Sequence, residues 1–241
     1  MGRILALLYG IVCYLIFFAV FLGSIWWVWT LDNPRPEVPL ARALGIDTAL
    51  LLLFAVQHSG MARQGFKQAW TRIVSPAIER SSYVLAASLA LLLLIVFWQP
   101  VPGVIWHADS AAVQFALHAV FGMGWLIVLG STFLLDHADL FGLRQVWTYW
   151  RRQSYQPLAF KTPSVYKLVR HPLYFGFLLA FWSTPRMTVG HLYFAAVTTV
   201  WILVAIQLEE RDLILFHGEQ YEVYRSGVSM LVPWPARKQK L

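Results

Sequence analysis

The sequence has few charged residues and almost no cysteine. Charged residues make up 13% of the 241 residues and hydrophobic residues 59%, whereas an ordinary soluble domain is about 25% charged. A chain of this length cannot bury so much apolar surface in one water-soluble core, which excludes a soluble enzyme and a disordered tail. The single cysteine, Cys13, excludes an intrachain disulfide and a cysteine-rich metal cluster. The histidines lack a recognised ligand spacing, so we expect no metal site.

Long apolar runs predict an all-α, polytopic integral membrane helical bundle. A spanning helix needs about 20 mainly apolar residues, and the segment 172–184 is too short to span upright. With the segment 187–208 it predicts a C-terminal helical hairpin, and five or six spans in total. We expect a single membrane-embedded domain with four spans in 1–135, a cytoplasmic loop in 136–171, the hairpin in 172–208 and a cytoplasmic segment in 209–241. The four N-terminal runs are 4–31, 43–62, 81–100 and 110–135.

The positions of lysine and arginine predict the orientation of these spans. Basic residues concentrate in the cytoplasmic loops of membrane proteins. With six crossings and a cytoplasmic N-terminus, only Arg35, Arg42 and Arg186 of the 19 basic residues fall in outer loops. Both termini are therefore predicted to be cytoplasmic, and the net charge of +7 requires no nucleic-acid partner. The first run exceeds the roughly 7–15 residues of a signal-peptide core, so we expect it to be a retained span.

Polar residues cluster at the predicted cytoplasmic ends of the spans. His58, and the pair Asp136 and His137, fit either a solvated helix end or a catalytic group. Pro172 suits the first turn of a helix, whose free N–H groups favour an anionic ligand group, as does the neighbouring arginine. Two adjacent carboxylates suit a cationic group, so the hairpin is expected to hold a zwitterion. The four clusters are 57–59, 136–139, 170–172 and 209–212.

Two motifs resemble signatures of one enzyme superfamily. The segment 162–176 contains R-H-P-L-Y-F-G, which resembles the R-H-P-x-Y-x-G signature of the isoprenylcysteine carboxyl methyltransferase superfamily. The segment 209–225 resembles its E-E-x-x-L-x-x-x-x-G-x-x-Y-x-x-Y signature. The superfamily comprises integral membrane methyltransferases that use S-adenosylmethionine, and this chain departs from it at Pro163 or Ser164, where a glycine is common. The resemblance implies cofactor contacts from Lys167, Val169, Arg170, His171, Tyr174, Gly176, Glu209 and Glu210.

The segments 54–63 and 134–147 resemble a bacterial branch of this superfamily that methylates methanethiol to dimethyl sulfide. The resemblance implies in-line methyl transfer to a thiolate at the cytoplasmic face of the inner membrane. His58 or His137 is then the expected base, with Asp136 orienting one of them. The expected partners are a small thiol and membrane lipid, with no obligate protein partner. Two alternatives stay open: a superfamily member with a lipid, prenylcysteine or larger thiol acceptor, and a denitrification-associated membrane protein that is not a methyltransferase.

Overall fold

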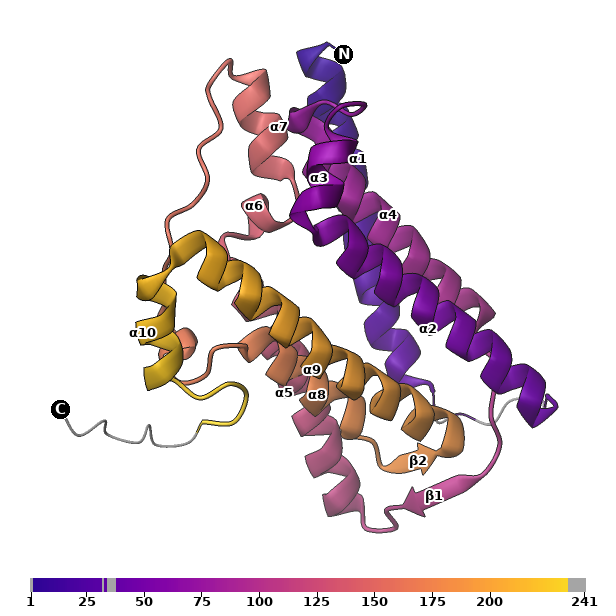
Figure 1. The fold of residues 1–241 in the computed structure, drawn as a ribbon. Coiled ribbons are helices and arrows are strands. Elements are labelled where there is room, and N and C mark those ends of the chain that lie inside the picture. Colours follow the sequence, from indigo (N-terminus) through magenta and orange to yellow (C-terminus); the bar gives the residue numbers. More distant parts are fainter. Residues whose placement is uncertain (1, 32, 34–37, 234–241) are drawn as a thin grey trace. The chain divides into compact units, whose positions relative to one another are not determined.

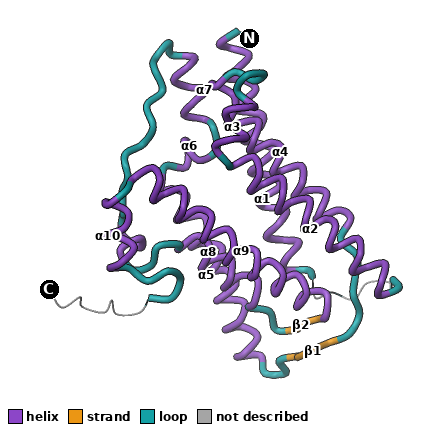
Figure 2. The backbone as a smooth tube through the Cα atoms, viewed as in Figure 1, coloured by secondary structure: helices purple, strands orange, loops and turns teal. Residues whose placement is uncertain are grey.

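A computed structural model describes residues 2–31, 33 and 38–233 (Figure 1). Helices dominate this part of the chain (Figure 2), which confirms the predicted helical membrane class. Two short strands, β1 (Val104–His107) and β2 (Arg186–Thr188), pair with each other and were not predicted. The expectations for Arg35, Arg237, Lys238 and Lys240 lie outside the described residues.

Five helices are long and apolar enough to span a membrane, so the protein is an integral membrane protein. Large apolar side chains such as Leu15, Val56 and Leu126 are exposed on them, as expected for surfaces that face lipid. The first four match the predicted runs to within about five residues, whereas the last continues well past Leu208. The five are α1 (Arg3–Trp29), α2 (Leu40–Ala62), α4 (Pro76–Phe97), α5 (Ala111–Leu135) and α9 (Val189–His217).

The chain forms two compact units, the first made of Met1–Gly103, Asp136–Pro157 and Thr188–Gly190. In this unit α4 packs against both α1 and α2. Helix α7 (Leu143–Trp150) packs against α1, where a Cβ on Gly10 would lie only 2.6 Å from a methyl group of Val146. The short helices α3 (Gln64–Trp70) and α6 (His137–Leu140) follow α2 and precede α7, respectively.

The second unit comprises Val104–Leu135, Leu158–Met187 and His191–Leu241. Its centre is the antiparallel contact of α5 with α8 (Pro172–Trp182). A Cβ on Gly176 would lie 2.6 Å from the carbonyl oxygen of Gly124, and a Cβ on Gly124 would lie 2.7 Å from the amide nitrogen of Ala180. The two backbones approach this closely because neither glycine has a side chain, a common arrangement between membrane helices.

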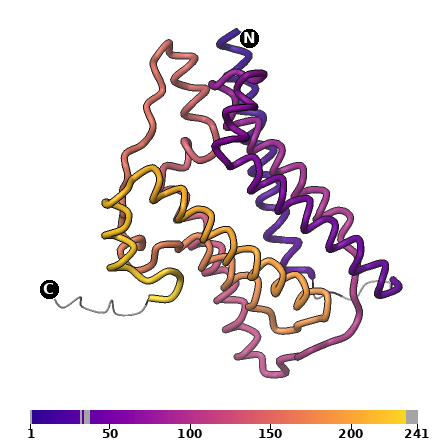
Figure 3. Tube along the Cα trace, in the orientation of Figure 1, coloured from indigo at the N-terminus to yellow at the C-terminus, as the bar shows by residue number. Residues whose placement is uncertain are grey.

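Helices α8 and α9 form the predicted hairpin, which the reader can follow in Figure 3. At its turn, Nε2 of His191 lies 2.8 Å from the carbonyl oxygen of Phe181, and the rings of Phe181 and Phe194 are 4.9 Å apart. The 11 residues of α8 correspond to roughly 17 Å of helix, which is about half of a bilayer core. The unit also contains η1 (Ser164–Lys167) and α10 (Glu219–Gly227).

Candidate functional site

The carboxylate of Glu210 is the centre of a buried ion cluster in the second unit. Its side chain is only 3% exposed, and its Oε1 accepts from Nε of Arg170 at 2.8 Å and lies 3.0 Å from Nε2 of His171. Its Oε2 lies 3.0 Å from Nε of Arg225. A buried charge without partners would be costly, and here two arginines compensate it. The hairpin prediction that brought the two motifs together is therefore confirmed in the structure.

Arg170 is committed to contacts within the protein. Besides its bond to Glu210, its Nη1 donates to the carbonyl oxygens of Arg225 and Val228. Its backbone N–H donates to Ser229 at 2.8 Å, and that of His171 to Met230 at 3.1 Å. These bonds attach the segment after α10 to the start of α8. The sequence led us to expect an anion-binding fork at Arg170, and in the structure its Nε and Nη1 both donate to acceptors within the protein.

Glu209 differs from its neighbour in being open to a ligand. Its side chain is 45% exposed, and its Oε2 lies 3.9 Å from Nδ1 of His171. A carboxylate with this exposure keeps most of its acceptor positions available. Of the two adjacent glutamates, Glu210 is therefore buried within the ion cluster, whereas Glu209 is exposed at its edge.

Three tyrosines surround the same carboxylates. Burial raises the pKa of Tyr166 and of Tyr221, and the nearby carboxylates raise both further. Burial raises the pKa of Tyr224 to about 12, against the opposing effect of Arg170. All three hydroxyls therefore stay protonated at neutral pH and can donate hydrogen bonds. Tyr224 donates to the carbonyl oxygen of Tyr166 at 2.6 Å, whereas the buried hydroxyl of Tyr221 has no hydrogen-bond partner among the described residues.

The other predicted cofactor residues lie just before α8 or within it. The ring of Tyr174 is 5.7 Å from that of His171, in the first turn of the helix. Val169 is buried and pairs with Ser229 in a parallel bridge, whereas Lys167 is exposed. Gly176 is turned toward α5 by the close contact described above, so its position serves helix packing.

The predicted base His58 lies in the first unit, on α2. Its ring is stacked on Phe54 with a centroid distance of 5.3 Å. The hydroxyl of Tyr83 lies 3.1 Å from Nδ1 and 3.2 Å from Nε2 of the histidine. The ring is thus held by one aromatic face and one hydroxyl, a geometry that leaves one nitrogen for another partner.

The other predicted base, His137, is the first residue of α6 in the same unit. Its Nε2 lies 2.9 Å from the hydroxyl of Tyr14. Burial lowers the pKa of His137 from its usual value, and the charge of Asp136 opposes this shift. Asp136 caps α6, because its Oδ1 accepts from the N–H of Asp139 at 3.0 Å. The aspartate thereby fixes the turn that carries His137.

Several residues of the ion cluster were not predicted to take part in it. Arg225, Tyr221 and Tyr224 lie in the second motif, and their spacing from the glutamates was the available signal. Tyr166 was part of the first motif, and it is buried close to Glu209, whose charge contributes to its raised pKa. No group of three or more potential metal ligands gathers among the residues that the structure describes.

Five candidate spans and a buried ion cluster at the base of a helical hairpin define a polytopic membrane protein with a buried polar cluster. The chain is 52% identical to the methanethiol S-methyltransferase of Crocosphaera subtropica, over 99% of this chain and 95% of the relative. It is 50% identical to the Mycobacterium tuberculosis enzyme of that name, over 98% and 99% of the two chains. The chain belongs to the methanethiol S-methyltransferase family. Nurim of Sus scrofa is 34% identical over 78% of this chain and 72% of the relative. No family model and no solved structure matches the chain.

Proposed function

We propose that the protein transfers a methyl group from S-adenosylmethionine to methanethiol, forming dimethyl sulfide. The observation that carries this proposal is the full-length identity of about half of all positions to relatives named for that activity. In the balanced reaction the thiol loses its proton, and its sulfur forms a bond to the methyl carbon. The bond between that carbon and the sulfonium sulfur breaks, which leaves S-adenosylhomocysteine.

The residues of the second unit fit S-adenosylmethionine. The buried hydroxyl of Tyr221 has no hydrogen-bond partner among the described residues, so it can donate a hydrogen bond to a ligand. Glu209 offers an exposed carboxylate to a cationic group, and the first N–H groups of α8 suit an anionic one. When bound, S-adenosylmethionine supplies an activated methyl group on a positive sulfur.

The protein's own residues then have separate parts. Glu209 and Tyr221 bind S-adenosylmethionine. Arg170, His171 and Arg225 hold the buried Glu210, which fixes the position of Glu209 next to it. Tyr174 presents an aromatic face at the start of α8, and such a face stabilises a nearby cation by about 0.5–2 kcal/mol. Orientation of the two reactants supplies a large share of the rate.

The thiol must lose its proton before it attacks, because the thiolate is the nucleophile. We propose His137 or His58 as the group that accepts this proton. Burial lowers the pKa of His137, so the ring is neutral at pH 7 and ready to accept. Asp136 acts as a positioning residue, through its cap of α6.

We further propose that both termini and the ion cluster lie on the cytoplasmic side of the bacterial inner membrane. The support is the distribution of basic residues at the ends of the spans. Reporter fusions after Leu31 and after Pro233 test the orientation. A cytoplasmic reporter should be active at the second position and a periplasmic reporter at the first.

Headspace gas chromatography on detergent-purified protein tests the reaction. We expect dimethyl sulfide from methanethiol and S-adenosylmethionine, with none from boiled protein. Replacing the base should lower kcat by at least about tenfold without changing the affinity for S-adenosylmethionine. The variants His58→Gln and His137→Gln, assayed side by side, identify which histidine carries the proton. If S-adenosylmethionine binds but no dimethyl sulfide forms, the acceptor is not methanethiol.

A further inference from the structure

A second polar site lies in the first unit, built from residues that have no part in the methyl transfer proposed above. It is a cavity of about 640 Å³ between α3, the beginning of α4, α7 and the chain that follows α7. Its wall includes Lys67, Glu79, Arg80, Asp139 and Tyr155. A cavity of this size with several polar side chains suits a small polar ligand or the headgroup of a larger one.

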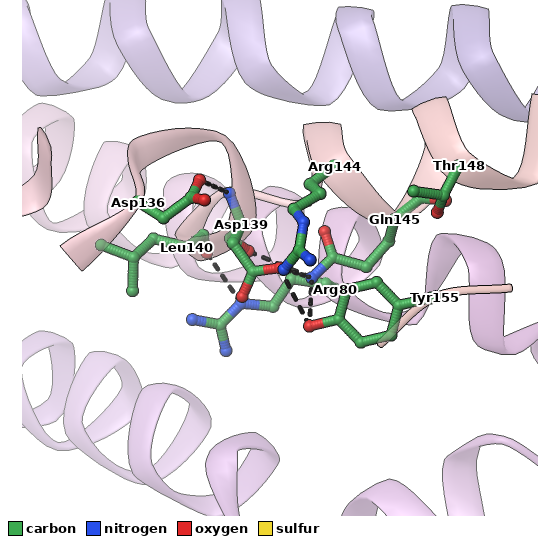
Figure 4. Close-up of polar contacts among 8 residues, drawn as sticks. All are labelled: Arg80, Asp136, Asp139, Leu140, Arg144, Gln145, Thr148 and Tyr155. Carbon is green, nitrogen blue, oxygen red and sulfur yellow. Dashed lines mark hydrogen bonds and ion pairs between the residues drawn. The ribbon is translucent and has the colours of Figure 1, made fainter. Parts of the chain in front are cut away.

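One wall of the cavity is a network around Asp139 (Figure 4). Its Oδ1 accepts from Nη1 of Arg144 at 3.1 Å, from the hydroxyl of Tyr155 at 2.9 Å and from Nε2 of Gln145 at 3.3 Å. The arginine compensates the charge of the carboxylate, so this wall is ordered and close to neutral. The Oε1 atom of Gln145 is buried without a hydrogen-bond partner among the described residues, and it can accept from a ligand.

Arg80 is held in place through its Nε, and its two terminal nitrogens have no hydrogen-bond or ion-pair partner among the described residues. Its Nε donates to the carbonyl oxygen of Leu140 at 2.7 Å, and its guanidinium lies 4.9 Å from the ring centre of Tyr83. In Figure 4 the two terminal nitrogens point away from the Asp139 network. Within the described ranges no carboxylate forms an ion pair with Arg80. An arginine fixed by Nε and open at its two ends is preorganised for an oxyanion.

Lys67 brings a second positive charge to the same cavity. It lies on α3, is partly buried, and its ammonium has no ion-pair or hydrogen-bond partner in the described part of the chain. Glu79 is the third charged side chain of the wall without an ion-pair partner there. The three together leave a net charge of one positive unit, which matches a singly charged phosphodiester better than a polyphosphate.

The position along the chain places this cavity at the depth of lipid headgroups. The part of its wall from Lys67 to Arg80 follows the end of α2 at Ala62 and includes the first turn of α4, which begins at Pro76. Beside them, the large apolar side chains of Phe66 and Ile73 are exposed, the latter to 83%. An exposed apolar side chain next to basic residues at the end of a span is typical of the membrane interface.

We propose that this cavity binds a phosphate group through Arg80 and Lys67. The source that the surroundings favour is the phosphodiester of an anionic phospholipid, with the glycerol headgroup inside the cavity and the acyl chains beside Phe66 and Ile73. A soluble phosphate is the other source of the same chemistry. The site shares no residue with the ion cluster around Glu210, and the proposal stands whatever the methyl acceptor is.

Native mass spectrometry of delipidated, detergent-purified protein tests the site. Titration with phosphatidylglycerol should give one tightly bound lipid, whereas diacylglycerol, which lacks the phosphate, should not bind there. A parallel titration with inorganic phosphate, followed by the melting temperature, identifies a soluble source. We expect Lys67→Gln and Arg80→Gln each to weaken lipid binding by about tenfold, the effect of losing one charge-assisted hydrogen bond. Glu79→Gln should strengthen it.

The matched control is Arg72→Gln, which removes the same charge from an exposed position of the same loop. It should leave the affinity unchanged. Lys67→Gln keeps the test decisive if Arg80→Gln fails to fold, because Lys67 makes no described side-chain bond. The proposal is overturned if Lys67→Gln, Arg80→Gln and Arg72→Gln lose lipid affinity equally. It is also overturned if neither phosphatidylglycerol nor phosphate binds. Weakened phosphate binding in the cavity variants, with no lipid bound, supports the phosphate site and assigns it to a soluble ligand.

Discussion

Nε of Arg170 donates to Oε1 of Glu210 across 2.8 Å, although 40 residues of chain separate the two. The contact joins the entrance of α8 to the far arm of the hairpin. With His171 and Arg225 it holds one buried negative charge against three basic side chains. Glu210 is buried in this cluster, whereas Glu209 is 45% exposed. We propose that Glu210 is a structural residue and that Glu209 binds the ligand, and this division can be tested.

Glu210→Gln should destabilise the protein strongly. The substitution keeps the shape of the side chain but leaves Arg170, which is 11% exposed, without its counter-ion. Breaking a buried pair by removing one partner costs about 3–5 kcal/mol, so the melting temperature in detergent should fall by many degrees. Glu209→Gln is the matched control. It should leave the melting temperature nearly unchanged and weaken the binding of S-adenosylmethionine in calorimetry. Equal melting temperatures for the two variants would contradict the assignment.

Tyr221→Phe should separate stability from binding. The hydroxyl of Tyr221 is buried without a partner among the described residues, and leaving such a group unsatisfied costs about 1–3 kcal/mol. Without ligand, the phenylalanine variant should therefore melt at the same or a higher temperature. With S-adenosylmethionine, the stabilisation seen in the parent protein should shrink. The comparison variant is Tyr224→Phe, which loses its bond to the carbonyl of Tyr166 and should be less stable in both conditions. A lower melting temperature for unliganded Tyr221→Phe would argue that the hydroxyl has a protein partner.

Gly176→Ala should disrupt the contact between α5 and α8. The added Cβ would lie 2.6 Å from the carbonyl oxygen of Gly124 and 2.9 Å from the amide nitrogen of Val128, and neither backbone atom can move alone. Overpacking of this kind costs about 1–3 kcal/mol or more. The control variants are Gly122→Ala and Gly130→Ala in the partner helix α5. A Cβ at either position has open space around it, so both should be neutral or slightly stabilising. Thermal unfolding of the three variants is the measurement, and three similar curves would refute the close contact.

Asp136→Asn should shift the acidic limb of the pH profile toward lower pH. His137 must be unprotonated to accept a proton, so kcat/KM falls as the pH drops through its pKa. Burial already lowers this pKa, and the charge of Asp136 raises it. Removing that charge lowers it further, while asparagine still caps α6. A limb that stays in place would assign the proton transfer to His58.

The bounds of the spans could be predicted closely from the sequence, because apolar runs such as Ile4–Leu31 are stable only as helices within the bilayer. The hairpin followed from two apolar segments, 172–184 and 187–208, that only two residues separate. The end of α9 was harder to place. The charged residues that follow Leu208 suggested the end of a helix, but the helix continues to His217, since Glu210 is compensated by residues distant in sequence.

The parts that could not be predicted depend on tertiary contacts. In the sequence, an arginine next to a predicted helix N-terminus indicates an anion-binding residue. Only the fold shows that Nε and Nη1 of Arg170 donate to Glu210 and to backbone carbonyls. The cavity beside Arg80 has no local signature, because its walls come from three separate stretches of chain. The orphan hydroxyl of Tyr221 likewise becomes visible only when its surroundings are known.

The contact between Gly124 and Gly176 also bears on how the protein is made. Helix α8 has 11 residues, and a segment of that length is too short to be released into the bilayer as an independent span. Its docking surface belongs to α5, which leaves the ribosome well before it. Helix α8, which begins at the ion cluster, is therefore held in place by α5 rather than by lipid. Because α5 is synthesised first, its surface is already available when α8 emerges.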